Sequence, residues 1–407
     1  MSAFERSVLS VYVAYALQSF GTAISWQFVT HWVKNDLGTP DFITLTVVWA
    51  TPAFVTMVAV NLWGAISDRV EKRKPFMLVG FLAYSGTFVM YSLVTTSMEF
   101  LIAAIIGSFF YSAALPMGQA HLTSRTERKG ERLGHFLAWQ SAGWFCGAVF
   151  SGFTYQPHLM STLYQIASVI CVTAFACCAA FIKDLPFEKK EEESQLGFLS
   201  LIRRPGIGRL SAAMFSSQVG INALAFLMAI MIIDELGGAP YMVGISNGGA
   251  TAIAVAITGY VGTQVDRRGP TRILIFAYVT YILFSIGFGL VRDPVLAVIM
   301  WSLPLYPLAY TAAYALGAVL SNEEERGRAM SLLTGAQNGG AAVGPIVGGL
   351  LAEFVFNRLA QPISFITLAF NFVALLLAYS LLRSGIGLVK QDSEEDSAPT
   401  QAEPLSH

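Results

Sequence analysis

Uncharged polar side chains recur on two apolar stretches that lie about half a chain apart. Gln18 and Thr22 are four residues apart, and Gln218 and Asn222 repeat that spacing 200 residues later. This spacing places both side chains of each pair on one face of a helix. Carboxamides and hydroxyls donate and accept hydrogen bonds without changing their charge. The chemistry that they indicate is reversible binding of a neutral solute rather than bond-making.

A second set of amides repeats in a similar way. Gln140 corresponds to Gln337 at an offset of 197 residues, and Ser141 corresponds to Asn338. Asn247 lies on a further apolar stretch. Polar side chains are costly in hydrocarbon, so we expect all these amides to turn toward a common interior and line a cavity. The alternative is hydrogen bonding between helices that only holds the bundle together.

Aromatic side chains with a polar tip accompany these amides. Tyr306, Tyr310 and Tyr314 recur every four residues and so share one side of a helix, and Tyr111 lies near the centre of an earlier apolar stretch. Such rings suit a site for an amphipathic or ring-bearing solute. Ordinary core packing is the alternative. The two prolines beside Tyr306 should bend their helix.

Two polar loops of similar sequence each separate two apolar stretches. The first reads W-G-A-I-S-D-R-V-E-K-R-K-P from position 63, and the second reads G-T-Q-V-D-R-R-G-P-T-R from position 262. The glycine permits close helix packing, and the carboxylate can meet the positive N-terminus of another helix. We expect these loops to gate the protein by latching its cytoplasmic ends together. The matched residues are Gly64, Asp68 and Arg69 in the first loop and Gly262, Asp266 and Arg267 in the second.

The loop pair resembles the Gly-x-x-x-Asp-Arg-x-Gly-Arg-Arg signature of the major facilitator superfamily. Glu71 stands where the signature has its second glycine, whereas the other copy keeps Gly269 but has Pro270 and Thr271 at usually basic positions. The resemblance implies an all-α polytopic membrane protein with two pseudo-symmetric six-helix bundles. It also implies a secondary transporter that works by alternating access around a site between the bundles.

The hydropathy of the chain predicts twelve transmembrane helices. Each stretch is near the length needed to cross a bilayer, about twenty residues, or longer. With both termini cytoplasmic, 22 of the 25 Lys and Arg residues fall on the cytoplasmic side, as the positive-inside rule requires. The predicted helices are 7–33, 42–66, 75–95, 98–121, 134–155, 161–182, 207–234, 240–263, 272–291, 294–320, 328–355 and 361–382. The expected parts are an N-terminal bundle (1–182), a cytoplasmic linker (183–206), a C-terminal bundle (207–383) and a disordered acidic tail (384–407).

Composition excludes several classes of protein. Only 13% of the residues are charged, against about 25% in a typical soluble domain. The net charge is −1 and the basic residues are scattered over loops, so nucleic acid binding is not expected. The four cysteines lie in apolar stretches and read as buried thiols. No nucleotide-binding loop, nucleophile motif or metal-ligand spacing occurs, so we expect no enzyme activity, no cofactor and no metal.

Protons are the candidate coupling ion, although no carboxylate lies near the middle of the first, fourth, seventh or tenth predicted helix. A proton-coupled transporter usually needs a group that titrates as substrate binds. The nearest groups are Glu353 and His31 toward the outer face, and His121 and His135 toward the inner face. Either an off-centre group serves the coupling, or transport is uncoupled.

Together these features predict a multi-pass protein of the cell membrane, expected to be monomeric, that moves a small-molecule substrate across the lipid bilayer. The aromatic, neutral interior favours export of small, moderately hydrophobic organic solutes. The paired amides favour an alternative, uptake or facilitated diffusion of a neutral polar solute such as a sugar, because amides hydrogen-bond hydroxyls. Two further alternatives are lysolipid transport, which needs a lateral opening toward lipid, and a receptor that transports nothing.

Overall fold

The structure is a computed structural model that describes residues 3–123, 129–182, 205–303, 305–322 and 325–386. All regular elements in these ranges are helices. The first part of the chain forms α1 (Ala3–Trp26), α2 (Val29–Asn35), α3 (Phe42–Val70), α4 (Lys74–Leu93), α5 (Ser97–Tyr111), α6 (Ala114–Thr123), α7 (Lys129–Thr154), η1 (Pro157–Leu159) and α8 (Met160–Phe181). The second part forms α10 (Pro205–Ala225), α11 (Met228–Ile230), η2 (Met231–Glu235), α12 (Pro240–Arg268), α13 (Pro270–Leu290), α14 (Pro294–Trp301), α15 (Leu305–Leu320), α16 (Arg326–Phe354) and α17 (Ile363–Arg383).

Many of these helices are long and apolar enough to cross a membrane. Within the described residues nine spans meet that test, or ten if the pair 206–225 and 228–235, bent by 41°, counts as one. The predicted fifth and eleventh helices correspond to α7 and α16, which fall outside this set. Both carry many glycines, and each packs on helices from both parts of the chain, so they need less apolar surface. The count of twelve therefore stays a prediction.

Four predicted helices are interrupted, and the interruptions follow the repeat. The first predicted helix breaks between α1 and α2 at Gln27 and Phe28, and the seventh breaks between α10 and α11 at Phe226 and Leu227. The fourth and tenth break in the same way, between α5 and α6 and between α14 and α15. The breaks in the first, fourth and seventh helices were not predicted, whereas the prolines near Tyr306 predict a bend in the tenth.

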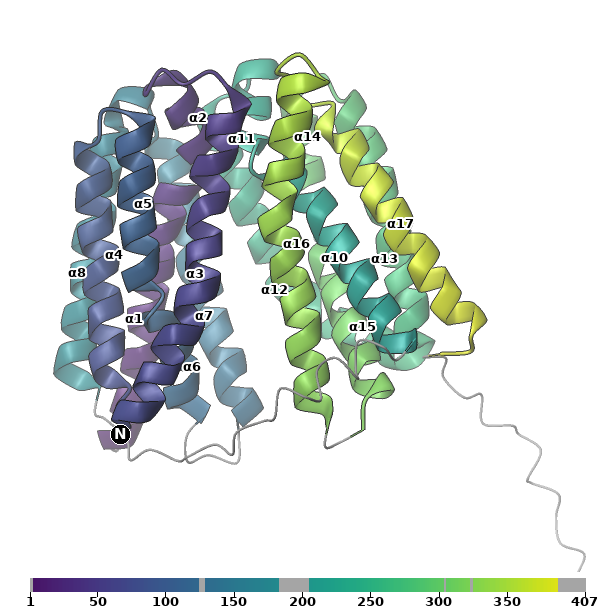
Figure 1. Cartoon of the computed structure of the whole chain (residues 1–407), viewed down its shortest axis with the longest axis horizontal. Helices are drawn as coiled ribbons and strands as arrows, with labels where there is room; N and C mark the ends of the chain where they lie inside the picture. Colours follow the sequence, from purple (N-terminus) through teal and green to yellow (C-terminus); the bar gives the residue numbers. More distant parts are fainter. Residues whose placement is uncertain (1–2, 124–128, 183–204, 304, 323–324, 387–407) are drawn as a thin grey trace, which may run out of the picture.

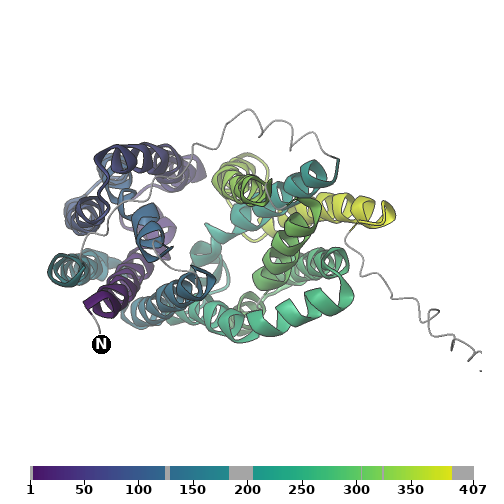
Figure 2. The same ribbon diagram turned by 90° about the horizontal axis from the view of Figure 1, so that it is seen from below.

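The helices form two groups, which we call the N-terminal group (α1–α8) and the C-terminal group (α10–α17). Figures 1 and 2 show them side by side, the first in purple to blue and the second in teal to yellow. Within the N-terminal group α1 packs on α7 and α8, and within the C-terminal group α10 packs on α16 and α17. Each group buries its own cluster of apolar side chains. The exact domain boundaries stay a prediction, since most of the expected linker and tail lies outside the described residues.

The two groups touch mainly at one end of the molecule. Contacts between them join α3 to α16, α7 to α12 and α2 to α11. We call the end around Thr30, Asp234 and Glu353 the packed end, and the opposite end around Arg69 and Arg267 the splayed end. In Figure 1, α3 and α16 approach each other at the packed end, at the top, and diverge toward the splayed end, where the N-terminus lies.

Candidate functional site

The two predicted polar pairs are buried, each within its own helix group. In the C-terminal group, Oε1 of Gln218 accepts hydrogen bonds from the Tyr310 hydroxyl at 3.1 Å and from Nδ2 of Asn222 at 3.2 Å. In the N-terminal group, Nε2 of Gln18 donates to Oγ1 of Thr22 at 2.8 Å. Gln18 and Gln218 are each only 5% exposed. The repeated spacing thus produces a hydrogen bond between side chains four residues apart in both groups, with Gln18 as the donor in one and Gln218 as the acceptor in the other.

The two glutamines differ in one respect. Oε1 of Gln18 is buried and has no hydrogen-bond partner among the described residues, whereas Oε1 of Gln218 has two donors. An unpaired buried amide oxygen costs free energy, on the order of 1–3 kcal/mol. Gln18 therefore offers a free acceptor to any group that can reach it. Tyr111, which lies on the fourth predicted helix of the N-terminal group, instead stacks on Tyr84 with the ring centroids 4.3 Å apart.

A cavity of about 130 Å³ lies at the break between α14 and α15. Trp301 ends α14, Tyr306 lies in the first turn of α15, and Ile221 reaches the cavity from α10. The lining carries no charged side chain and very few polar groups; its remaining residues are Leu224, Ala250, Tyr281, Phe284, Leu303, Leu305 and Thr367. Because the helix is interrupted here, the wall is built from aromatic rings rather than from a regular helix face.

Gln218 and Tyr310 also line a much smaller hollow of about 10 Å³. Tyr306, which lines the larger cavity, lies beside Tyr310 of this smaller hollow, with the two ring centroids 5.9 Å apart. One turn further along α15, the Tyr314 hydroxyl donates to Oε1 of Gln337 at 2.9 Å. Two hydroxyls of the predicted tyrosine stripe thus donate to the amides of α10 and α16, and the role of the stripe in a substrate site stays a prediction.

Other predicted cavity residues are placed differently. Asn247 accepts a hydrogen bond from Nε1 of Trp301 at 3.2 Å and donates to Oε1 of Gln27 across the two groups at 3.3 Å. This favours the alternative role for Asn247, hydrogen bonding between helices. Gln140 is partly buried and Asn338 exposed, and neither makes a hydrogen bond within the described part of the chain. Their role in a cavity stays a prediction.

The six predicted gating residues lie at the splayed end. Asp68, Arg69, Asp266 and Arg267 are exposed and form no hydrogen bond or ion pair within the described ranges. A Cβ atom at Gly64 or at Gly262 would meet open space. In this conformation the side chains of these four charged residues are therefore available to new partners.

Glu71, which stands where the signature has its second glycine, has a left-handed backbone conformation. Glu71 ends α3 with φ of 55°, in the left-handed region, and Gly269 ends α12 with φ of 86°. The two positions are 198 residues apart, the same offset as the loop motif. Both loops thus need a positive φ at the same point. Glycine adopts it freely, whereas Glu71 does so at a steric cost.

Polar contacts join the two groups at the packed end, and they involve residues that were not predicted to line a cavity. Oε2 of Glu353 accepts the backbone N–H of Phe42, the first residue of α3, at 2.9 Å. The Thr30 hydroxyl donates to the carbonyl oxygen of Phe226 at 2.8 Å. Asp234 binds Lys34 with 2.7 Å between Nζ and Oδ2. Opposite charges at the ends of helices in the two halves were a sequence signal for the pair of Asp234 with Lys34, and the other two contacts use backbone groups that leave no such signal.

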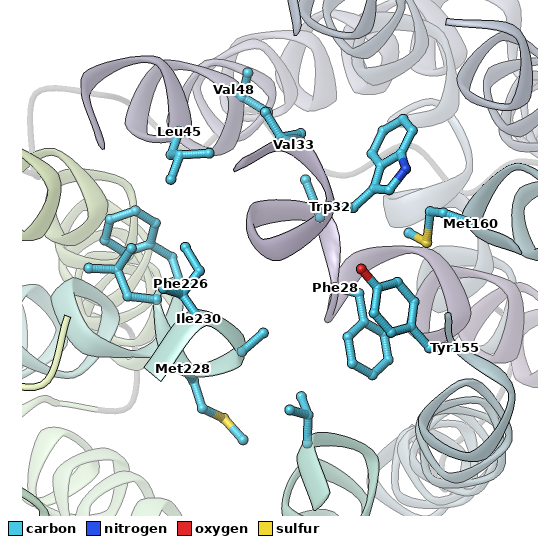
Figure 3. Close-up of a cluster of buried hydrophobic side chains, with 14 of the residues drawn as sticks. Phe28, Trp32, Val33, Leu45, Val48, Tyr155, Met160, Phe226, Met228 and Ile230 are labelled. Carbon is cyan, nitrogen blue, oxygen red and sulfur yellow. The ribbon is translucent and has the colours of Figure 1, made fainter. Parts of the chain in front are cut away.

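An apolar cluster fills the space between the groups at the packed end. Figure 3 shows side chains from both groups gathered there, with Phe28 lying against Tyr155. The two rings stack with centroids 4.0 Å apart and an angle of 3° between their planes. From the C-terminal group the cluster receives Phe226, Met228 and Ile230, which lie at the break between α10 and α11. This cluster closes the packed end of the interface.

The sequence of this chain is similar to a family model and to curated proteins. A model of the "Major Facilitator Superfamily" matches residues 11–321. A "Multidrug resistance protein MdtG" from Enterobacter lignolyticus is 24% identical over 365 residues, covering 83% of each chain. Another protein of that name, from Serratia proteamaculans, is 21% identical over 338 residues, or 78% of this chain and 79% of its own.

Solved structures share the fold at lower identity. The nucleoside transporter NupG superposes with a TM-score of 0.74 and 16% identity, over 94% of this chain and 99% of its own. A bacterial homolog of the human lysosomal transporter Spinster, in an inward-facing and occupied conformation, superposes with a TM-score of 0.72 and 13% identity. That match covers 92% of this chain and 96% of the other.

Proposed function

This chain belongs to the major facilitator superfamily, and from that membership we propose that it exports small, moderately hydrophobic organic compounds by alternating access. It is a membrane transporter and not an enzyme. The substrate site lies in the C-terminal group, at the break between α14 and α15. The observation that carries this proposal is the charge-free aromatic cavity at that break.

The chemistry of the cavity defines the class of solute. An apolar cavity on the order of 150 Å³ can hold one benzene ring. The rings of Trp301 and Tyr306 offer faces and edges to such a group, with about 1 kcal/mol for each favourable ring pair. The Gln218 and Tyr310 pair beside it provides polar atoms for one functional group of the solute. A molecule with an aromatic part and a neutral polar part fits both.

The proposed direction of transport, export, is based on the names of the curated relatives. The two curated relatives described above carry the name of a multidrug resistance protein, and each aligns with more than three quarters of this chain. Their identity is low, so they support export as a class of activity and no particular compound. We place the protein in the plasma membrane, or the inner membrane of a bacterium, with both termini in the cytoplasm.

The arrangement of the two groups supports the mechanism. With the N-terminus in the cytoplasm, the packed end faces outward and the splayed end faces inward, as in the inward-facing Spinster homolog. Export then requires the packed end to open while the splayed end closes. In that second state Asp68 with Arg69, and more weakly Asp266 with Arg267, latch the cytoplasmic ends. Gly64 and Gly262 then allow the loops to approach.

A second function, uptake of a neutral polar solute, is favoured by one observation. Oε1 of Gln18 has no hydrogen-bond partner in the part of the chain that the structure describes, and a sugar or nucleoside hydroxyl is a suitable donor. The similarity to the nucleoside transporter NupG is in fold alone and leaves this choice open. The aromatic cavity is the reason to rank export first.

Flux in proteoliposomes separates the two functions. The purified protein is reconstituted and tested with a neutral aromatic dye and with a radiolabelled sugar, each with and without a pH gradient. Export predicts saturable movement of the dye that is weakened by Tyr306→Ala, and a response to the gradient would identify protons as the coupling ion. Movement of the sugar alone, indifferent to the dye and to pH, would overturn the proposal.

A further inference from the structure

A cluster of titratable side chains joins the two groups at the packed end. Nε2 of His31 lies 3.1 Å from Oδ1 of Asp234, and Nδ1 of His31 lies 2.8 Å from the Tyr155 hydroxyl. Lys34 holds the other carboxylate oxygen of Asp234. The His31 side chain is 5% exposed and that of Asp234 is 24% exposed, so water reaches the pair mainly from the side of the carboxylate.

The geometry accommodates both charge states of the imidazole. A carboxylate only accepts hydrogen bonds, so Nε2 must carry a proton in either state. The Tyr155 hydroxyl can donate to Nδ1 when His31 is neutral and accept from it when His31 is charged. The Tyr155 side chain is buried, and burial favours the uncharged hydroxyl over a phenolate. His31 can therefore bind or lose one proton without losing a hydrogen-bond partner.

The members of the cluster belong to different moving parts. His31 and Lys34 are in α2, and Tyr155 follows α7, so all three belong to the N-terminal group. Asp234 is in η2 of the C-terminal group. Opening the packed end must therefore take Asp234 away from His31 and leave Tyr155 in place.

Other charged groups near His31 stay on its own side of the interface. Asp36 caps α2, and burial raises the pKa of its carboxyl, while His31 and His158 of η1 act in the opposite direction. Within the described residues, Asp234 is thus the ionised partner of His31 that the C-terminal group supplies.

We propose that His31 is a proton-binding site whose occupancy favours the conformation with the packed end closed. This proposal rests on the proposed transport function and adds its regulation by pH. Protonated His31 gains the attraction of Asp234 only while the packed end is closed, and neutral His31 gains much less. By linkage, protonation therefore shifts the population toward the closed packed end, and the shift disappears at a pH high enough for His31 to lose its proton.

The physiological consequence follows from the proposed topology. The packed end faces outward, so acid outside the cell holds the outer gate closed. Neutral or alkaline conditions outside weaken one of the contacts that keep it closed. The hydrophobic cluster around Phe28, Phe226 and Ile230 still closes the gate by burial, so His31 adjusts the equilibrium rather than creating it.

Distances between spin labels test the proposal directly. Cys146, Cys171, Cys177 and Cys178 are replaced, and labels are attached at Pro40 of the N-terminal group and Leu359 of the C-terminal group, both exposed at the packed end. Spectra of the protein in lipid are recorded at about pH 5.5 and about pH 8, on either side of the imidazole range. We expect the ratio of short to long distances to be roughly tenfold higher at the lower pH, within the usual range of conformational coupling.

Three variants identify the group responsible. His31→Gln keeps hydrogen-bonding capacity without titration and is expected to abolish the pH response, as is Asp234→Asn. Lys34→Gln removes the charge beside Asp234 and leaves His31 in place, so it is expected to change the ratio at both pH values and keep the response. Dye flux at one fixed pH is measured in the same variants to confirm that transport persists.

The outcomes are distinct for the two proposals. If dye flux is absent in the unmodified protein, the proposed function fails whatever the labels show. If flux is present but the distances do not change with pH, or if His31→Gln retains the full response, the proton-binding role of His31 is wrong.

Discussion

Gly152 of α7 and Gly244 of α12 cross so closely that a Cβ atom on Gly152 would lie 2.7 Å from the Cα of Gly244. The matching crossing, in repeat-related positions, is that of Gly349 of α16 with Thr46 of α3, where a Cβ atom would collide with the threonine hydroxyl. The same contact therefore occurs twice, with the roles of the two groups exchanged. This is the interface expected when two copies of one unit face each other.

Gly244→Val tests the importance of this crossing. The added side chain has no room beside the carbonyl oxygen of Ala148 and the backbone of Gly152, so α7 and α12 must separate. We expect the packed end to open and transport to fall at least tenfold, a cost of about 1.4 kcal/mol or more. Gly259→Val on the same helix is the control, because its Cβ would meet open space. Equal flux in both variants would contradict the role of the crossing.

Tyr306→Ala tests the substrate cavity. The Tyr306 side chain is 39% exposed, so its removal should cost little stability, but the cavity loses one aromatic wall. We expect binding of an aromatic solute to weaken about fivefold to tenfold, since one ring contact contributes about 1 kcal/mol. Tyr260→Ala, which removes a more exposed tyrosine from α12, should leave affinity unchanged. Fluorescence titration of the purified variants provides the comparison, and unchanged affinity in Tyr306→Ala would place the site elsewhere.

Glu71→Gly tests the strain at the end of α3. Glu71 holds φ of 55°, which costs a non-glycine residue roughly 1 kcal/mol. Glycine removes that cost, so we expect a higher midpoint of thermal unfolding in detergent. Gly269→Ala at the matching position should lower the midpoint, because φ there is 86°. If Glu71→Gly lowered the midpoint and Gly269→Ala raised it, the two loops would not share this backbone requirement.

Asp68→Asn tests the latch. Asp68 is exposed and unpaired in this conformation within the described residues, so the variant should fold, insert and show unchanged stability of this state. The lost charge matters when the splayed end closes, and we expect the transport rate to fall about tenfold, with a smaller effect for Asp266→Asn. Initial rates are compared at equal amounts of inserted protein. Rates equal to those of the unmodified protein would remove Asp68 from the gating mechanism.

The sequence predicted much of the fold because its signals are local and repeated. Helix positions follow from runs of apolar residues, and the offset near 198 residues indicates a duplicated unit. The breaks at Phe28 and Phe226 were not predicted. They lie in apolar stretches without a proline, and they arise where each helix bends to bring its end into the packed cluster. Such tertiary causes leave no local pattern.

The candidate site was predictable in part. The pairing of Gln18 with Thr22 and of Gln218 with Asn222 follows from helix geometry. The sequence did not indicate that Tyr310 would satisfy Gln218 while Gln18 kept a free oxygen, because that depends on which helix lies opposite. The sequence identifies His31 as a candidate titrating group but does not identify its partners. Its partners are distant in sequence, so only the fold could supply them.

Alternating access requires the two helix groups to rock, so that one end closes as the other opens. Spin-label distances measured at both ends of the protein in lipid, between Pro40 and Leu359 and between Val70 and Arg326, follow this motion. If the groups rock, conditions that lengthen the first distance shorten the second. Distances that change at one end while the other stays fixed, or that lengthen together, would contradict it.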